Sequence, residues 1–198
     1  MIRAAIDHLV VTAPSLAAGA AYIRDQLGVE MQPGGTHHAM GTHNLLLKLD
    51  DSTYLEVLAI DPDMTAPGRP RWFDLDRVTA PGLATWVARV ADIHAAALAL
   101  GIPVSHITPM SRGALNWLIT IEDGGGISGT MPVLIQWLNG PHPATMLPSS
   151  DCSLRELQVC FAGAPHITLD DRCVTGRELT ATIQSPNGLR TLRTTPPA

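Results

Sequence analysis

The segment that decides the fold is "AIDHLVVTAPSLAAGAAYIRDQLG", residues 5–28. Its first nine residues are rich in β-branched and other apolar side chains, which predicts a strand. Residues 16–27 then carry apolar side chains at helical spacing, between Ser15 as an N-cap and Gly28 as a C-terminal stop. The segment therefore predicts a β-α unit.

Three further strands are expected to follow this unit, at residues 29–33, 41–49 and 53–61. The polar "DDS" between the last two predicts a β-hairpin, so the first sixty residues have the order β-α-β-β-β. Residues 63–80 are rich in proline and have few periodic apolar residues, which indicates a connector.

The same order returns after the connector. A strand is expected at 82–91, then a helix between Asp92 as cap and Gly101 as stop, then strands at 103–107, 114–122 and 131–139. Neither copy can bury its sheet alone, and two curved half-sheets placed side by side enclose a cleft. We therefore expect an α+β fold of two tandem βαβββ modules, residues 1–62 and 81–142, that form an open cup-shaped mixed sheet. A β-rich extension is expected at 150–198.

Composition excludes several classes of protein. The chain has 198 residues, 45% of them hydrophobic, which is enough to fill a core. Its net charge is −5 and its Lys and Arg residues form no cluster, so we expect no nucleic-acid partner. The sequence contains no stretch of about 18 consecutive apolar residues, so we expect no membrane span. The glycine-rich run at 123–129 lacks GxGxxG spacing, so no nucleotide cofactor is expected.

The three cysteines are Cys152, Cys160 and Cys173, an odd number without CxxC spacing. They are interpreted as buried or free thiols in a reducing cytoplasm. The N-terminal residues mimic a signal peptide, but Asp7 and Pro14 interrupt the apolar segment, and we interpret them as part of a folded cytoplasmic protein.

Two ionisable residues stand inside predicted strands. His8 interrupts the first strand, and Glu56 lies in the middle of the fourth. A buried carboxylate needs a partner, and a His8–Glu56 hydrogen bond without a metal would give both residues one and provide a general base. The alternative for His8 is a core histidine that donates to a backbone carbonyl. Superposing the two copies sets His8 against Thr85 and Glu56 against Gln136.

The pairing of "IDHLVV" with "YLEVLAID", repeated in degenerate form, resembles the vicinal oxygen chelate superfamily. The stretches "HHAMGTHNLLLKLDDSTYLEV", "SRGALNWLI" and "MPVLIQW" resemble its glyoxalase-like domain branch, the glyoxalase, bleomycin resistance and dioxygenase fold. The resemblance covers residues 4–140. It implies metal ligands on the first and fourth strands of each module, a divalent ion such as Fe, Mn, Ni or Zn that chelates two neighbouring substrate oxygens, and a homodimer.

The positions that match these ligands are His8, Glu56, Thr85 and Gln136. The first two are chemically suitable, and Gln136 can offer a carbonyl oxygen, but neutral Thr85 and Gln136 compensate a divalent ion poorly. A catalytic centre usually needs three protein ligands, so a third is sought elsewhere.

His43 is the candidate third ligand, and the hairpin register decides its direction. An even loop sets Leu47 opposite Glu56 and turns His43 into the cup, since facing residues point the same way. An odd loop turns Leu46 or Lys48 inward and His43 toward the helix-covered side. Burying Lys48 is costly, which favours the even loop.

Other residues are expected to bind a substrate. Trp117 and Trp137 either pack in the core or form a flat apolar wall. Arg112 either binds a carboxylate at the rim or is an ordinary surface ion. His38 lies beside a glycine-rich stretch and either belongs to a solvent-exposed loop or lines the pocket. Thr85 is expected to line the pocket.

Three functions remain open at this point. The first is a metal-dependent lyase, isomerase or dioxygenase that acts on a small oxygen-rich substrate. The second is a metal-free protein that binds or sequesters a small molecule, as bleomycin-resistance relatives do. The third is a metal-free enzyme in which Glu56 abstracts a proton and His8 orients it.

Overall fold

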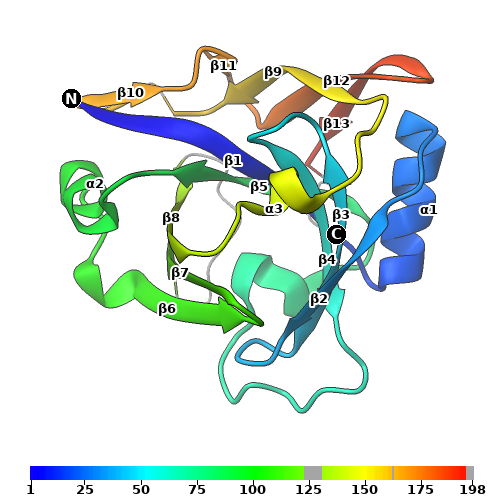
Figure 1. Cartoon of the computed structure of the whole chain (residues 1–198), viewed down its shortest axis with the longest axis horizontal. Helices are drawn as coiled ribbons and strands as arrows, with labels where there is room; N and C mark the ends of the chain where they lie inside the picture. The colour runs from blue at the N-terminus through cyan, green and yellow to red at the C-terminus, as the bar shows by residue number, and fades with distance from the viewer. Residues whose placement is uncertain (123–130, 162, 195–198) are drawn as a thin grey trace.

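A computed structural model of the chain describes residues 1–122, 131–161 and 163–194. The first half contains the expected β-α-β-β-β order (Figure 1). Its elements are β1 (Ile2–Thr12), α1 (Leu16–Leu27), β2 (Gln32–His37), β3 (Thr42–Lys48) and β4 (Tyr54–Ile60). The capping predictions for α1 are confirmed: Ser15 accepts a hydrogen bond from the Ala18 amide, and Gly28 has a left-handed φ of 76°.

The second half repeats this order with shorter elements. They are β5 (Gly82–Arg89), α2 (Ile93–Leu100), β6 (Ile107–Arg112), β7 (Leu115–Thr120) and β8 (Val133–Asn139). Asp92 and Gly101 cap α2 as predicted. The glycine-rich run at 123–129 lies outside the described residues.

Two strand positions and the connector differ from expectation. The second strand begins at Gln32 instead of residue 29, and residues 104–106 form a short 3-10 turn, η2 (Val104–His106), before β6. The connector contains a 3-10 element, η1 (Trp72–Arg77), in which Phe73 and Asp74 have positive φ angles of 57° and 52°. Aromatic residues in a proline-rich segment thus form an element that packs on the sheet.

The two halves join through β1 and β5, which pair antiparallel. In the described part of the chain the sheet order is β2-β3-β4-β1-β5-β8-β7-β6, so β2 and β6 are the two end strands. The sheet curves into a nearly closed cup, with α1 and α2 on opposite flanks of the molecule (Figure 1).

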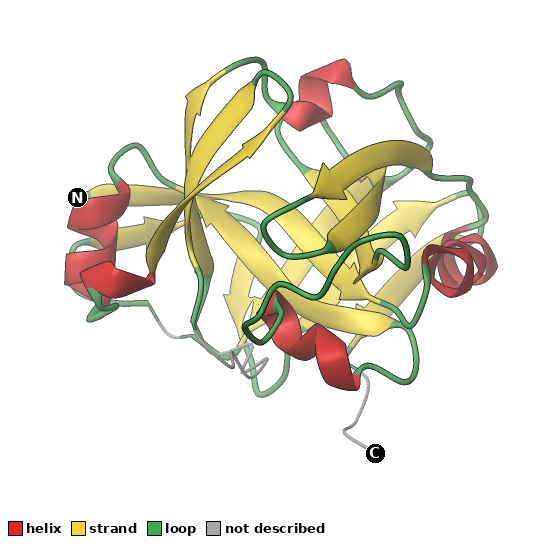
Figure 2. Ribbon diagram, turned by 90° about the horizontal axis from the view of Figure 1, so that it is seen from below, coloured by secondary structure: helices red, strands yellow, loops and turns green. Residues whose placement is uncertain are grey.

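The C-terminal extension is β-rich, as expected. A short helix, α3 (Pro143–Met146), precedes β9 (Ser153–Val159), β10 (Ile167–Leu169), β11 (Cys173–Thr175), β12 (Thr180–Ser185) and β13 (Gly188–Arg193). Four of these strands form a second sheet in the order β11-β9-β12-β13, while β10 pairs with β1. Helices lie at the periphery of the strands in the second view (Figure 2).

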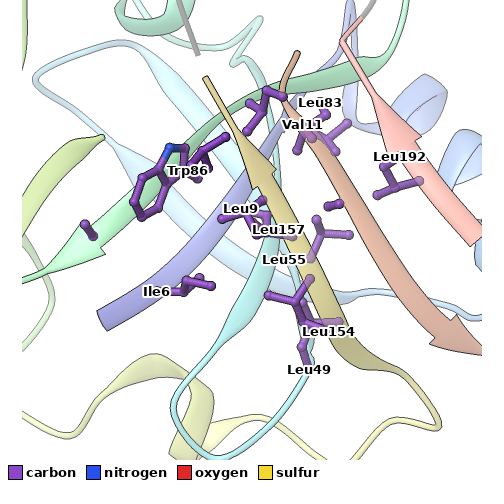
Figure 3. Close-up of a cluster of buried hydrophobic side chains, with 14 of the residues drawn as sticks. Ile6, Leu9, Val11, Leu49, Leu55, Leu83, Trp86, Leu154, Leu157 and Leu192 are labelled. Atoms are coloured by element: carbon purple, nitrogen blue, oxygen red, sulfur yellow. The ribbon is translucent and has the colours of Figure 1, made fainter. Parts of the chain in front are cut away.

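The cup has two faces with different partners. The convex face packs against α1, α2 and the second sheet, and Leu9, Leu55 and Trp86 belong to this core together with Leu154 and Leu157 of β9 (Figure 3). The concave face carries a separate apolar cluster that includes Val10, Leu58 and Trp117. The floor of the site is built on this concave face.

None of the described helices combines the length and the apolar character that a membrane crossing requires. The three cysteines are free thiols, as predicted. Burial and the nearby Asp170 carboxylate raise the pKa of the Cys173 thiol to about 12.

Candidate functional site

A β-bulge in β1 places two ionisable side chains on the concave face. Ile6 and Leu9 both belong to the convex core although they are three residues apart, and the pairing with β5 shifts between Ile6 and His8. A bulge adds one residue to a strand and redirects its side chains. Asp7 and His8 are therefore neighbours on the same side of the sheet.

Asp7 is completely buried and is surrounded by donors. Its Oδ2 accepts hydrogen bonds from Trp137 Nε1 and His142 Nε2, each at 3.0 Å, and an Arg89 nitrogen lies 3.5 Å away. Burial alone would raise the pKa of Asp7, but hydrogen bonds from His142 and His8 outweigh burial and hold that pKa well below its usual range. Asp7 is therefore a carboxylate at neutral pH.

His8 lies between two carboxylates. Its Nδ1–H donates to Asp7 Oδ1 at 2.7 Å, while Nε2 lies 3.5 Å from Glu56 Oε2. The Tyr54 ring stacks on the imidazole, with centroids 4.6 Å apart. Since Nδ1 carries a hydrogen toward Asp7, a lone pair on Nε2 would face a carboxylate oxygen unless one proton lies between them. Nε2 of His8 and Oε2 of Glu56 are thus the two atoms here between which a proton can move.

Glu56 is bound on its other side by Asn44. Asn44 Nδ2 donates to Glu56 Oε1 at 2.5 Å, and Asn44 Oδ1 accepts from the Gly35 amide at 2.8 Å. A side chain at Gly34 would collide with Asn44, since a Cβ built there lies 1.9 Å from Oδ1. The absence of a side chain at Gly34 in β2 therefore leaves the space that Asn44 occupies.

Arg112 and His37 form the part of the wall next to Asn44. An Arg112 nitrogen lies 3.3 Å from His37 Nε2 and 3.4 Å from Asn44 Oδ1. Burial lowers the pKa of His37 to about 4, against an opposing attraction from Glu56. His37 is therefore neutral at pH 7, and its Nε2 lone pair accepts from the guanidinium while Nδ1 lies 3.2 Å from Thr42 Oγ1.

These groups open on a cavity of about 410 Å³ that includes its open mouth. Aromatic and aliphatic side chains complete its wall: Tyr54, Trp72, Phe73, Trp117, Ile119, Ile135 and Trp137. Trp117 and Trp137 are in contact, with ring centroids 5.3 Å apart. A site with a few convergent polar groups inside an apolar wall is typical of small-molecule binding.

The structure brings five of the predicted site residues to this cavity: His8, Glu56, Arg112, Trp117 and Trp137. The other four lie elsewhere. His38 is exposed, and its neighbour His37 lines the wall instead. Thr85 pairs with Val10 in the sheet but does not line the cavity.

The predicted position of His43 was wrong because the hairpin loop is odd. Leu46 lies opposite Glu56, and His43 lies opposite Ala59, on the face away from the cavity. The apolar Leu47 and Leu49 belong to the convex core, not to the cup. Lys48 avoids burial at the strand end by pairing with Asp51 at 2.8 Å.

Gln136 was also misplaced. Ile135 and Trp137, its neighbours in β8, line the cavity, so the alternation of a strand turns Gln136 to the other face. There its Oε1 accepts from the Ile93 amide at 2.9 Å, at the first turn of α2. Its role is to satisfy a helix terminus.

Sequence reasoning missed Asp7, His37, Asn44 and Trp72. For Asp7 a signal existed, because two adjacent ionisable residues between Ile6 and Leu9 break the alternation of the strand. The odd hairpin loop puts Asn44 on the same face of the sheet as Glu56, so its place in the site could be predicted only once that register was known. Trp72 carried no signal, since its connector has no periodic pattern.

The donors at the cavity do not fit a divalent metal ion. No group of three or more His, Cys, Asp and Glu side chains suited to a metal occurs in residues 1–122, 131–161 and 163–194. The Asn44 amide oxygen is already bound to the Arg112 cation, and a guanidinium beside the site opposes a second positive charge. We therefore assign no step to a metal.

Comparison with known proteins agrees with this fold. The glyoxalase-like domain family matches residues 6–169. No curated protein sequence matches the chain. A solved hypothetical protein from Staphylococcus aureus is 17% identical, with a TM-score of 0.55, and the match covers 80% of this chain and 69% of that one.

Two further structures are similar at lower TM-scores. The methylmalonyl-CoA epimerase from Mycobacterium tuberculosis is 18% identical over 69% of this chain and 88% of its own, with a TM-score of 0.45. A Streptomyces coelicolor methylmalonyl-CoA epimerase in complex with 2-nitronate-propionyl-CoA is 16% identical over 70% of this chain and 100% of its own, also with a TM-score of 0.45. Because the family match spans most of its length, the chain belongs to the glyoxalase-like domain family.

Proposed function

We propose that this glyoxalase-like protein is a metal-independent enzyme of the lyase or isomerase type that moves a proton on a small molecule bound in the cavity. The observation that carries the proposal is the arrangement of His8, with Nδ1 bound to Asp7 and Nε2 facing Glu56 inside an aromatic cavity. A general base needs such a held imidazole or carboxylate within reach of its substrate.

In this mechanism the His8–Glu56 pair takes a proton from a substrate carbon and returns it to another atom. Asp7 fixes the tautomer of His8 and stabilises the imidazolium that forms when Nε2 accepts the proton. The Glu56 carboxylate, 3.5 Å from Nε2, attracts that imidazolium, and Asn44 keeps the carboxylate in place. Removal of a well-placed general base costs about 10²–10⁴-fold in rate.

The test is solvent deuterium incorporation, followed by proton NMR, into a panel of small oxo acids and hydroxyketones. Protein dialysed against a chelator should catalyse exchange, and Glu56→Gln and His8→Asn should each lose about 10²-fold or more. His94→Asn is the matched control, because His94 is exposed on α2, and it should keep full activity. Exchange that appears only after Fe, Mn, Ni or Zn is added would support the metal-dependent alternative instead.

A metal-free binding or sequestering protein is the second candidate. It is supported by the wall of four large aromatic side chains, which suits a flat ligand even without chemistry: Trp72, Phe73, Trp117 and Trp137. Binding of panel compounds without deuterium exchange, at an affinity unchanged in Glu56→Gln, would favour this function over catalysis.

A further inference from the structure

Arg112 spans the seam between the two ends of the sheet. It is the last residue of β6, one end strand, and its side chain lies against β2, the other end strand. A Cβ built on Gly35 would stand 2.8 Å from Arg112 Cδ, so the missing side chain at Gly35 is what admits the arginine. The guanidinium thereby enters the cavity wall from the opposite half of the molecule.

Both groups that hold the Arg112 guanidinium are neutral. His37 accepts through Nε2 at 3.3 Å and is uncharged at pH 7, and Asn44 accepts through its amide oxygen at 3.4 Å. No carboxylate lies within ion-pair distance of Arg112 in the described part of the chain. Arg71, by contrast, pairs with Asp76 at 2.5 Å. A half-buried guanidinium with neutral partners has its charge uncompensated and has donors left for an anion.

A second donor in the same wall also lacks a partner. Trp72 is 4% exposed, and its Nε1–H makes no hydrogen bond to any described residue. Buried N–H groups are nearly always satisfied, so this indole donor favours a ligand that brings an acceptor. Trp72 and Arg112 both contact His37, the indole edge-on with centroids 5.1 Å apart.

We propose that Arg112 anchors a carboxylate in this cavity, and that the ligand is a small monocarboxylic acid with a flat apolar group. The carboxylate meets the Arg112 fork, with Trp72 Nε1–H as an additional donor, and the flat group packs on Trp117 and Trp137. The inference rests on the proposed function in that both use one cavity, and it names the class of substrate.

The network also places the reacting carbon close to the carboxylate. The Asn44 amide contacts Arg112 through Oδ1 and Glu56 through Nδ2, so a single amide group separates the anion site from the proton-transfer pair. A hydrogen on a carbon next to the carboxylate end of the ligand therefore faces His8 and Glu56.

Isothermal titration calorimetry with a matched pair of probes tests the anchor. The wild-type protein should bind 3-phenylpropanoate at least about tenfold more tightly than the neutral 3-phenylpropanamide, as expected for a charge-assisted hydrogen bond. Arg112→Gln should abolish this preference, and Arg112→Lys should keep part of it, because an ammonium lacks the planar fork. Arg155→Gln, at an exposed arginine of β9, is the control and should keep the full preference.

Two further variants leave the charge in place. Gly35→Ala should reduce the preference for the acid because its Cβ displaces the Arg112 side chain, while amide binding stays unchanged. Trp72→Phe should weaken acid binding severalfold by removing one donor. Thermal melts of each variant show whether it is folded.

Each contrary result has a distinct meaning. Equal binding of acid and amide by the wild type would overturn the anchor and leave the cavity and its proton chemistry standing. A preference that survives in folded Arg112→Gln would place the carboxylate elsewhere and also overturn the proposal. Failure to bind either probe would refute this ligand class, whereas the proposed function fails only if deuterium exchange is absent across the whole panel.

Discussion

Asp7 sets the electrostatics of the site at the scale of a single residue. Its carboxylate is the common acceptor of His8, His142 and Trp137, which come from a strand, a helix cap and the opposite half of the sheet. The Nδ1 atom of His142 accepts from the Ala144 amide, so the hydrogen on Nε2 points at Asp7. Asp7 therefore positions His8 without lining the cavity itself.

Asp7→Asn should destabilise the protein by about 2–3 kcal/mol at pH 7, since it removes a buried charge-assisted acceptor. The depressed pKa of Asp7 contributes stability that is present above the usual carboxyl pKa near 4 and is lost as pH falls below it. Urea unfolding from pH 7 to pH 2.5 should show wild type and variant converging below about pH 4. A constant difference across this range would contradict the assignment.

His37 should make the stability of the fold depend on pH in a second range, above that of Asp7. Its pKa is lowered to about 4, so between that value and the usual 6.5 the unfolded chain binds more protons than the folded one. Stability should therefore fall as pH decreases from about 6.5 to 4, and His37→Gln should flatten this slope. The exposed His94→Gln variant, measured by the same urea titration, should keep the wild-type slope.

At the scale of elements, the second sheet supports α1. Asn187, in the turn between β12 and β13, directs Nδ2 at the Asp25 and Gln26 carbonyls at 3.3 and 3.4 Å. These are terminal carbonyls of the helix that have no partner within it. The turn thus caps α1 from a distant part of the chain.

Gly28→Ala and Gly101→Ala form a matched pair that measures this contact. Both glycines end a helix with φ near 70°, where a side chain costs about 1 kcal/mol. A Cβ at Gly101 meets open space, whereas one at Gly28 stands 2.6 Å from Asn187 Oδ1. The free energy of unfolding, measured with urea, should therefore fall by about 1 kcal/mol more in Gly28→Ala than in Gly101→Ala. Equal losses would show that the Asn187 side chain moves aside without cost.

At the scale of the whole molecule, the extension is part of the main body. β10 adds a strand to β1, and Leu154 and Leu157 of β9 share a core with Leu9 and Leu55 (Figure 3). Arg172 ties the extension to the hairpin loop, with hydrogen bonds to Asp50 at 2.6 Å and to Thr53 at 3.1 Å. The oligomeric state stays a prediction.

A chain shortened to residues 1–149 should aggregate, because the convex core would lose its cover and expose a large apolar surface. Size-exclusion chromatography of the shortened and full-length chains checks this outcome. A monodisperse shortened chain with a cooperative thermal transition would show that the two modules are stable without the extension.

The sequence by itself determined the elements and half of the site. Apolar periodicity and caps such as Ser15 and Gly28 are local signals, so they predict the duplicated order, and His8 and Glu56 stood out because charge inside an apolar strand is costly. Only the tertiary structure decided the rest. The bulge at Asp7, the odd hairpin loop that exchanges His43 for Asn44, and the contact of Arg112 with His37 all depend on pairing between strands. One residue of slip inverts every side chain in a strand, and which face is cavity or core is set by packing partners far away in the chain.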